Sequence, residues 1–249
     1  MFKFTAEPLG AWRIMGSSLS LYKHIFSRTW YLFILFLIRP INYFVGWTLD
    51  YNFAFCSFHT TPPTIATFSS KPFLIYFAVS LAVSLILLYT KCLALVRIND
   101  LITKPKTSLA TSVKTTASKY FPVLGNQIVV YFIISVLVMP LLLPGIFIGI
   151  LMLLSLPLIL FSKNKPMEAI KNSCGLVWGN WLHTCWSVIL PLLAFLFIGT
   201  YSPCLLGYGV HGKILAAILA LISSFFLIPW FWATILVLFN DLKLRAKTK

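Results

Sequence analysis

Six long apolar segments constrain this chain more than any other feature of its sequence. They cover residues 29–48, 72–96, 121–139, 145–161, 181–201 and 214–240, with short polar stretches between most of them. A helix needs about 20 apolar residues to cross a hydrocarbon core of roughly 30 Å, because each residue adds about 1.5 Å. The sequence therefore predicts an all-α, polytopic membrane protein with about six transmembrane helices.

The composition supports lipid as the solvent of most of this chain. Only five of its 249 residues are Asp or Glu, 59% are hydrophobic, and the mean hydropathy is +0.92. Soluble domains carry far more charge and less apolar surface. The net charge of +15 would also suit a nucleic-acid binder, but such proteins gather their cations on a soluble face. Here the cations lie between apolar segments, so we expect no nucleic-acid partner.

The third and fourth apolar segments are joined by a stretch that contains Pro140, Pro144 and Gly145. Proline removes a backbone donor, and proline and glycine together interrupt helical hydrogen bonding. We expect a tight turn here that returns the chain into the membrane. The alternative is one long helix, which would have to kink sharply and would extend beyond the bilayer.

The Lys and Arg residues are distributed very unequally when the six spans alternate across the membrane. Two of them, Lys71 and Lys213, fall on one side. Sixteen fall on the other: Lys3, Arg13, Lys23, Arg28, Arg97, Lys104, Lys106, Lys114, Lys119, Lys163, Lys165, Lys171, Lys243, Arg245, Lys247 and Lys249. Loops rich in Lys and Arg stay in the cytoplasm, so we expect both termini there. No apolar stretch with a cleavage site precedes the first span, so we expect no cleavable signal peptide.

The polar segments on the predicted cytoplasmic side resemble one another. Stretches 104–118 and 165–179 each open with Lys-Pro, and proline suits the first turn of a helix. Aligned, they match at Lys104 and Lys165, Pro105 and Pro166, and Ser112 and Ser173, with Tyr120 opposite Trp181. We interpret the chain as a single membrane domain of three units, 1–96, 97–162 and 163–240, and a basic tail, 241–249. Each unit would be a cytoplasmic interfacial helix followed by a transmembrane hairpin.

One part of the sequence resembles a known family. Pro144-Gly145-Ile146-Phe147 is followed by an apolar run, by 165–173 with its Lys-Pro-Met-Glu-Ala sequence, and by Gly179-Asn180-Trp181. This order is similar to that of YciC-like bacterial inner-membrane proteins and of the membrane domain beside some glycerophosphodiester phosphodiesterases. The resemblance implies a multi-span protein of the bacterial inner membrane without an assigned activity. No soluble segment could house the catalytic domain, so it does not imply phosphodiesterase activity.

Arg39 lies in the middle of the first apolar segment, followed by Pro40 and Asn42. A charge at the centre of a bilayer costs about 2.5–3.5 kcal/mol on insertion scales, so it usually faces a partner or a polar cavity. Together with Asn126 and Gln127 of the third segment, Arg39 and Asn42 could form a site for an anion or a lipid headgroup. Alternatively, Arg39 reaches toward the interface and bonds carbonyls freed by Pro40.

Two cysteines, Cys56 and Cys204, fall on the predicted outer side, with His59 and His211 nearby in sequence. A disulfide between Cys56 and Cys204 would suit an oxidising outer compartment. The four side chains could also hold zinc, although Cys-x-x-His spacing is common by chance, and free thiols are the third alternative. We expect no metal or cofactor. The remaining cysteines, Cys92, Cys174 and Cys185, should stay reduced.

Residues that could support catalysis are sparse. Glu168 is explained by its place at the start of a helix, where a carboxylate is favoured, and His183 has no evident neighbour to orient it. No phosphate loop, nucleophile elbow or zinc-protease motif occurs. We therefore expect a non-enzymatic membrane protein that contacts the anionic inner leaflet or serves as a scaffold or accessory subunit for other membrane proteins. The alternative is a small transporter or channel for an anionic or lipid-like solute.

Overall fold

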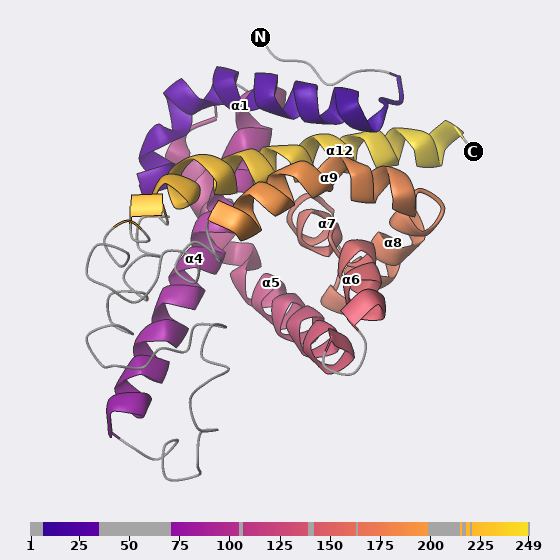
Figure 1. The fold of residues 1–249 in the computed structure, drawn as a ribbon. Helices are drawn as coiled ribbons and strands as arrows, with labels where there is room; N and C mark the ends of the chain where they lie inside the picture. The colour runs from indigo at the N-terminus through magenta and orange to yellow at the C-terminus, as the bar shows by residue number, and fades with distance from the viewer. Residues whose placement is uncertain are drawn as a thin grey trace. The chain divides into compact units, whose positions relative to one another are not determined.

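The described part of the chain is helical almost throughout. The computed structural model describes residues 7–34, 71–104, 107–138, 142–162, 164–198, 215, 218–219 and 221–248, and none of these lies in a strand. The helices are α1 (Ala11–Ile34), α4 (Lys71–Thr103), α5 (Leu109–Val138), α6 (Leu142–Leu151), α7 (Ser155–Phe161), α8 (Pro166–Trp178), α9 (Trp181–Leu196), the π-helical η3 (Ser223–Leu227) and α12 (Ile228–Thr248) (Figure 1). The all-α prediction is confirmed.

Four stretches of helix are long and apolar enough to cross a membrane: Phe77–Thr103, Leu109–Leu137, Pro144–Phe161 and Phe225–Lys247. They overlap four of the six predicted spans, with boundaries that differ by several residues. A fifth, shorter apolar helix runs over Trp181–Ala194, and residues 199–214, which follow soon after it, lie outside the described part of the chain. Most of the first predicted span, 29–48, lies outside the described residues. Length and apolar composition thus mark the chain as a membrane protein.

The contacts divide the chain into two compact units. Unit 1 comprises Met1–Thr29, Lys91–Pro191 and Trp230–Lys249, and unit 2 comprises Trp30–Thr90 and Leu192–Pro229. In unit 2, the first half of α4 leaves Leu74, Ile75 and Phe77 more than half exposed, as expected where lipid solvates a helix. Every Lys, Arg, Asp and Glu among the described residues belongs to unit 1, with the exception of Lys71.

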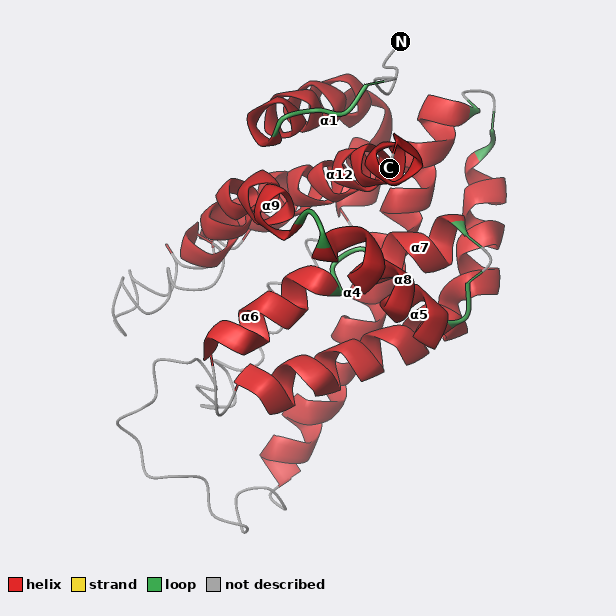
Figure 2. Cartoon of the chain, turned by 90° about the vertical axis from the view of Figure 1, so that its right-hand side faces the viewer, coloured by secondary structure: helices red, strands yellow, loops and turns green. Residues whose placement is uncertain are grey.

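Helix α12 is the central helix of unit 1. Seven consecutive residues, from Ala233 to Phe239, are buried, which requires neighbours on every side rather than on one stripe. Three of those neighbours make specific contacts. Phe161 of α7 lies with its ring centroid 6.0 Å from that of Phe239. Lys91 of α4 lies over the Trp232 ring, and Ser18 of α1 accepts hydrogen bonds from Trp230 and Thr234. Figure 2 shows α1 running alongside α12.

Helix α1 packs against α12 through one stripe of its surface. The buried residues in unit 1 recur every three or four positions along the helix: Ile14, Met15, Ser18, Leu21, Ile25 and Thr29. Sequence analysis placed an interfacial helix before residue 29 and a span after it. The structure has one continuous helix across that boundary, as far as Ile34.

Helix α5 also joins two predicted elements into one. It runs from Leu109 to Val138, whereas the sequence suggested an interfacial helix ending at 118 and a span beginning at 121. Pro122 lies inside α5 and lacks the N–H that would bond the Ser118 carbonyl, but this loss of one bond does not end the helix. Similarly, the predicted basic tail continues α12 as far as Thr248.

The chain does turn back between α5 and α6. The two helices contact one another, which excludes the alternative of a single long helix. Pro144 and Gly145 were expected within the turn, but they lie in the first turn of α6, where proline has no helical hydrogen bond to lose. Residues 139–141, including Pro140, lie outside the described residues.

The corner between α8 and α9 accounts for the Gly-Asn-Trp motif. Helix α8 begins at Pro166 as predicted, and the Glu168 side chain accepts the Lys165 N–H at 3.1 Å. Gly179 ends the helix, and α9 begins at Trp181. The rings of Trp178 and Trp181 lie on either side of the corner, and both contact Phe147 of α6, at centroid distances of 5.8 and 5.1 Å.

Candidate functional site

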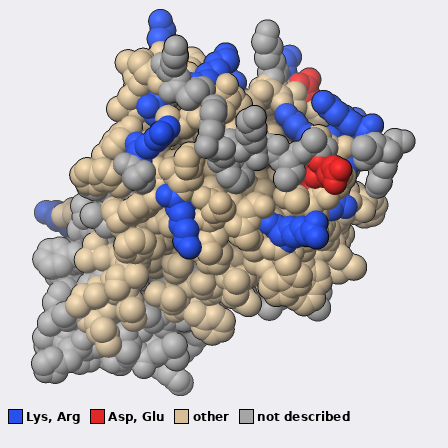
Figure 3. Space-filling view, turned by 90° about the horizontal axis from the view of Figure 1, so that it is seen from above, with Lys and Arg blue, Asp and Glu red and all other residues tan. Residues whose placement is uncertain are grey.

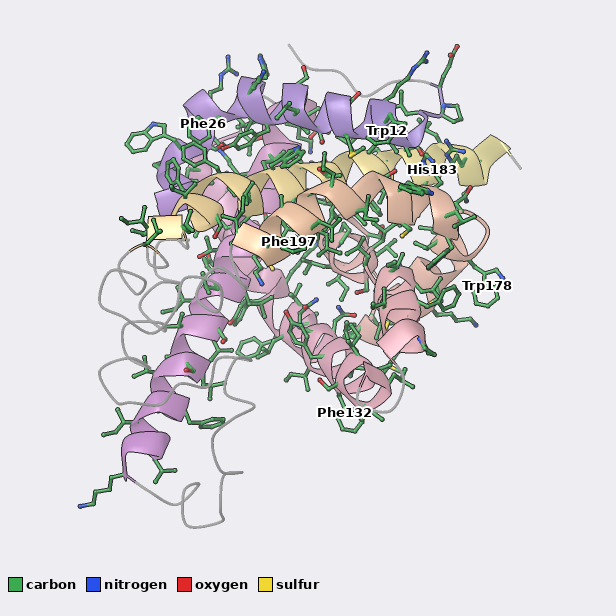
Figure 4. The ribbon with its side chains drawn as sticks, viewed as in Figure 1. Trp12, Phe26, Phe132, Trp178, His183 and Phe197 are labelled. Carbon is green, nitrogen blue, oxygen red and sulfur yellow. The ribbon has the colours of Figure 1, made fainter. Side chains whose placement is uncertain are left out.

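A buried charged cluster joins the segment before α1, the start of α9 and the end of α12. At its centre is Asp241, which is 3% exposed. Its carboxylate accepts the Leu9 backbone N–H at 2.6 Å, Arg245 Nε at 2.8 Å and His183 Nε2 at 3.1 Å. Arg245 Nη2 also donates to the Leu9 carbonyl. Both backbone polar groups of Leu9 are thus held by α12, and Figure 4 shows His183 beside that helix.

Local sequence explains how these groups meet. Arg245 follows Asp241 by four residues, a spacing that places both side chains on one face of α12. His183 comes three residues after Asn180, whose N–H donates to the Val177 carbonyl at the α8–α9 corner. The corner therefore fixes the position of His183 in the first turn of α9. A buried carboxylate must be paired with charge and donors to be tolerated. Asp241 has three donors, and because a carboxylate only accepts, His183 Nε2 must carry a proton.

Sequence analysis missed this cluster. It placed Asp241 at the start of a basic tail and found no neighbour to orient His183, whereas the structure pairs these two side chains. The two residues are 58 positions apart, so no local spacing connects them. One signal was present, because Asp241 is the only acidic residue after Glu168 and follows an apolar segment directly.

The chemical capacity of the cluster is limited by its own bonds. A histidine and aspartate pair can serve as a general base when a reacting group lies within reach of the histidine. Here the carboxylate is engaged by protein donors, including a main-chain N–H. Within the described ranges, no group of three or more His, Cys, Asp or Glu side chains is arranged to hold a metal ion. The geometry is that of a structural clamp between distant parts of the chain.

A second polar contact closes the break between α6 and α7. Pro157 cannot donate to the Leu153 carbonyl, and its ring would clash with it in a continuous helix, so the chain turns at residues 152–154. The turn leaves backbone groups without helical partners. Ser173 of α8 supplies a partner for two of these groups. Its hydroxyl donates to the Leu151 carbonyl at 2.6 Å and accepts the Leu154 N–H at 3.1 Å.

The residues predicted to form a polar site are only partly placed. Arg39 and Asn42 lie outside the described residues, so the site that they would form with Asn126 and Gln127 of α5 remains a prediction. Asn126 is fully buried in α5 and donates from Nδ2 to Ser155 Oγ of α7 at 3.1 Å. Among the described residues, Oδ1 of Asn126 has no hydrogen-bond partner. Gln127 is half-buried beside it.

The cysteines, like the residues of the predicted polar site, are only partly placed. Cys56 and Cys204, with His59 and His211, lie outside the described residues, so the disulfide remains a prediction. Cys92, Cys174 and Cys185 are free thiols. Cys174 packs against the buried Val130, Met152 and Ile170, and this burial raises the pKa of its thiol, which therefore stays protonated at neutral pH.

The face of α1 that points away from α12 is basic. Arg13 and Lys23 are exposed on it, together with Trp12, which is 73% exposed. Arg28 is exposed at the edge of the buried stripe. Figure 3 looks onto this side of unit 1 and shows Lys and Arg spread widely over it, with Asp and Glu at few places. One exposed acid, Glu7, precedes the helix. Cations interspersed with an exposed indole form a surface that suits anionic headgroups.

Comparisons of this chain with models of protein families, with curated proteins and with solved structures find no match. They therefore add no relative whose activity could be carried to this chain. The argument for function rests on the residues described above.

Proposed function

We propose that this chain is a multi-pass protein of a bacterial inner membrane that acts without catalysis, through contact with anionic lipid or as a scaffold or accessory subunit for other membrane proteins. Six spans follow if the predicted segments at 29–48 and 181–201 are added to the four described stretches. Leu9 is bonded to Asp241 and Arg245, so the start of α1 and the end of α12 lie together. An even number of spans, with both termini in the cytoplasm, accommodates this contact.

The membership of a YciC-like family is part of the same proposal. Its support is the stretch from Pro144 to Trp181, which contains the proline in the first turn of α6, the break between α6 and α7, a capped α8 and a sharp corner at Gly179. These elements explain, in structural terms, why proline, glycine and tryptophan occur in this order in the sequence. They also favour the arrangement in which a polar helix precedes a membrane hairpin, as α8 precedes α9 and α12.

The observation that carries the lipid proposal is the division of α1 into two faces. Its apolar stripe is used against α12, so the basic face is left for another partner. That partner must be anionic and must tolerate an exposed indole ring. The headgroup layers of a bacterial membrane offer both, because their lipids are anionic and the interface favours tryptophan. Each cation near such a surface contributes about 1 kcal/mol.

Neutralising the basic face should weaken binding of anionic lipid. We expect the triple variant Arg13→Gln, Lys23→Gln, Arg28→Gln to lose about a hundredfold in affinity for phosphatidylglycerol, since three contributions of about 1 kcal/mol disappear. The measurement is quenching of tryptophan fluorescence by brominated phosphatidylglycerol, titrated into full-length protein in neutral nanodiscs. Brominated phosphatidylcholine gives the background.

A matched variant separates the α1 face from net charge. Replacing Lys114, Lys165 and Lys171 by glutamine removes three exposed cations of unit 1 that lie outside α1. Phosphatidylglycerol binding should fall less in this variant than in the α1 variant, because the α1 face is intact. An equal loss in both triple variants would mean that α1 holds no particular lipid surface.

A transporter or channel is the second candidate, and one observation favours it. Asn126 brings an unpartnered amide oxygen into the buried side of a candidate span, next to the break between α6 and α7. Broken helices with polar groups at membrane depth line pathways in many transporters. Anion or lipid flux in proteoliposomes that is lost in Arg39→Leu and in Asn126→Leu would support this candidate. Wild-type vesicles no leakier than protein-free vesicles would eliminate it.

A further inference from the structure

We infer that Asp241, Arg245 and His183 form a latch that decides whether the first turns of α1 stay docked on α12. The latch holds a single residue of the N-terminal segment, Leu9, by both its N–H and its carbonyl. Gly10 follows and accepts the Ile14 N–H at 3.0 Å, which is the first helical bond of α1. The latch therefore acts on the residue directly before the helix begins.

Apolar packing alone does not fix α1 in this position. The first half of the helix buries Ile14, Met15 and Leu21 against the rest of unit 1. In a membrane, lipid tails are as apolar as these side chains, so exchanging α12 for lipid costs little hydrophobic free energy. Polar contacts must then supply much of the preference for the docked position. Ser18 provides one such contact, with Trp230 and Thr234, and the latch provides the other.

The latch is the stronger of these two polar contacts. Its bonds are charge-assisted, and hydrogen bonds to charged groups contribute roughly twice as much as bonds between neutral groups. The carboxylate is faced by His183 from α9, by Arg245 from its own helix and by Leu9 from the N-terminal segment. Removal of the charge at Asp241 weakens all three bonds at once.

Opening the latch would change what unit 1 presents to a membrane. The docked α1 shows its basic face, whereas a released first half would also present the apolar stripe of Ile14, Met15 and Leu21. Such a segment is an amphipathic helix that can enter the interface of the bilayer. This consequence rests on the proposed lipid function, but the latch itself does not, and it is therefore tested without anionic lipid.

Hydrogen exchange of the full-length protein in a neutral detergent tests the latch. In Asp241→Asn, which keeps the size of the side chain and an acceptor for Leu9, backbone amides of residues 9–15 should exchange about tenfold faster than in wild type. Amides of α8 should be unchanged. Arg245→Gln should accelerate the same residues, because it removes the donors to Asp241 and to the Leu9 carbonyl, and it serves as the second variant if Asp241→Asn does not fold.

The control is Asp100→Asn. Asp100 is another carboxylate of unit 1, and it accepts a hydrogen bond from Ser112 at 2.7 Å. Of the described N-terminal residues 7–10, none is hydrogen-bonded to it. Exchange of residues 9–15 should match wild type in this variant. Unchanged exchange at 9–15 in both latch variants, or an equal acceleration of α8, would overturn the inference. The first result would mean that the latch does not hold α1, and the second that the cluster stabilises the fold as a whole.

Discussion

Replacing Ser173 with alanine should lower the free energy of unfolding by about 2–4 kcal/mol. The Ser173 hydroxyl satisfies the Leu151 carbonyl and the Leu154 N–H, and alanine leaves both without a partner. Each unsatisfied buried group costs about 1–3 kcal/mol, and a backbone group at membrane depth has no water to replace the lost bond. The measurement is SDS-induced unfolding of the purified protein in mixed micelles, followed by tryptophan fluorescence.

Ser118→Ala is the matched control for this prediction. Ser118 lies exposed on α5, and its hydroxyl donates to Thr115 O, a bond that water replaces readily. Its stability should stay within about 0.5 kcal/mol of wild type. A Ser173→Ala protein as stable as Ser118→Ala would show that the break between α6 and α7 does not depend on α8.

The second large effect is expected at Asp241. Asp241→Ala removes the partner of Arg245, His183 and the Leu9 N–H, and loss of one member of a buried ion pair typically costs about 3 kcal/mol or more. Much of this cost arises because the Arg245 guanidinium is left without a counter-charge, and less of it from the attraction that is lost. The double variant Asp241→Ala, Arg245→Ala should therefore recover part of the stability. The same SDS titration measures both.

The double variant decides between two accounts of the charged cluster. If the cost comes from an unpaired cation, the double variant is more stable than Asp241→Ala alone. If the cost comes from packing, the two truncations add, and the double variant is less stable than either single variant. The second outcome would contradict the electrostatic account of the clamp.

The parts of the fold that the sequence revealed are those with a local cause. Apolar length located the helices of four predicted spans, because a helix of that length and composition has few alternatives. The Lys-Pro-x-Glu sequence located the start of α8, since Pro166 and Glu168 act within the first turn, and Gly179 located its end. Each of these signals is contained in a few neighbouring residues.

The features that were missed depend on contacts between distant residues or on competition between bonds. The charged cluster requires that residues 9, 183 and 241 come together, which only the packing of the helices decides. The break before Ser155 requires a hydroxyl from another helix to fill it. The expected boundary near residue 120 failed for another reason, because a helical backbone tolerates one missing bond at Pro122 when its flanks are helical.

The central position of α12 bears on the order in which the molecule is assembled. Ribosomes make chains from the N-terminus, so α1, α4, α7 and α9 all leave the ribosome before the helix that they surround. During this interval their inward-facing side chains must be solvated by lipid or by insertion factors. Assembly of these helices therefore follows the two-stage order, in which separate spans form first and associate later, with the arrival of α12 as the step that completes unit 1.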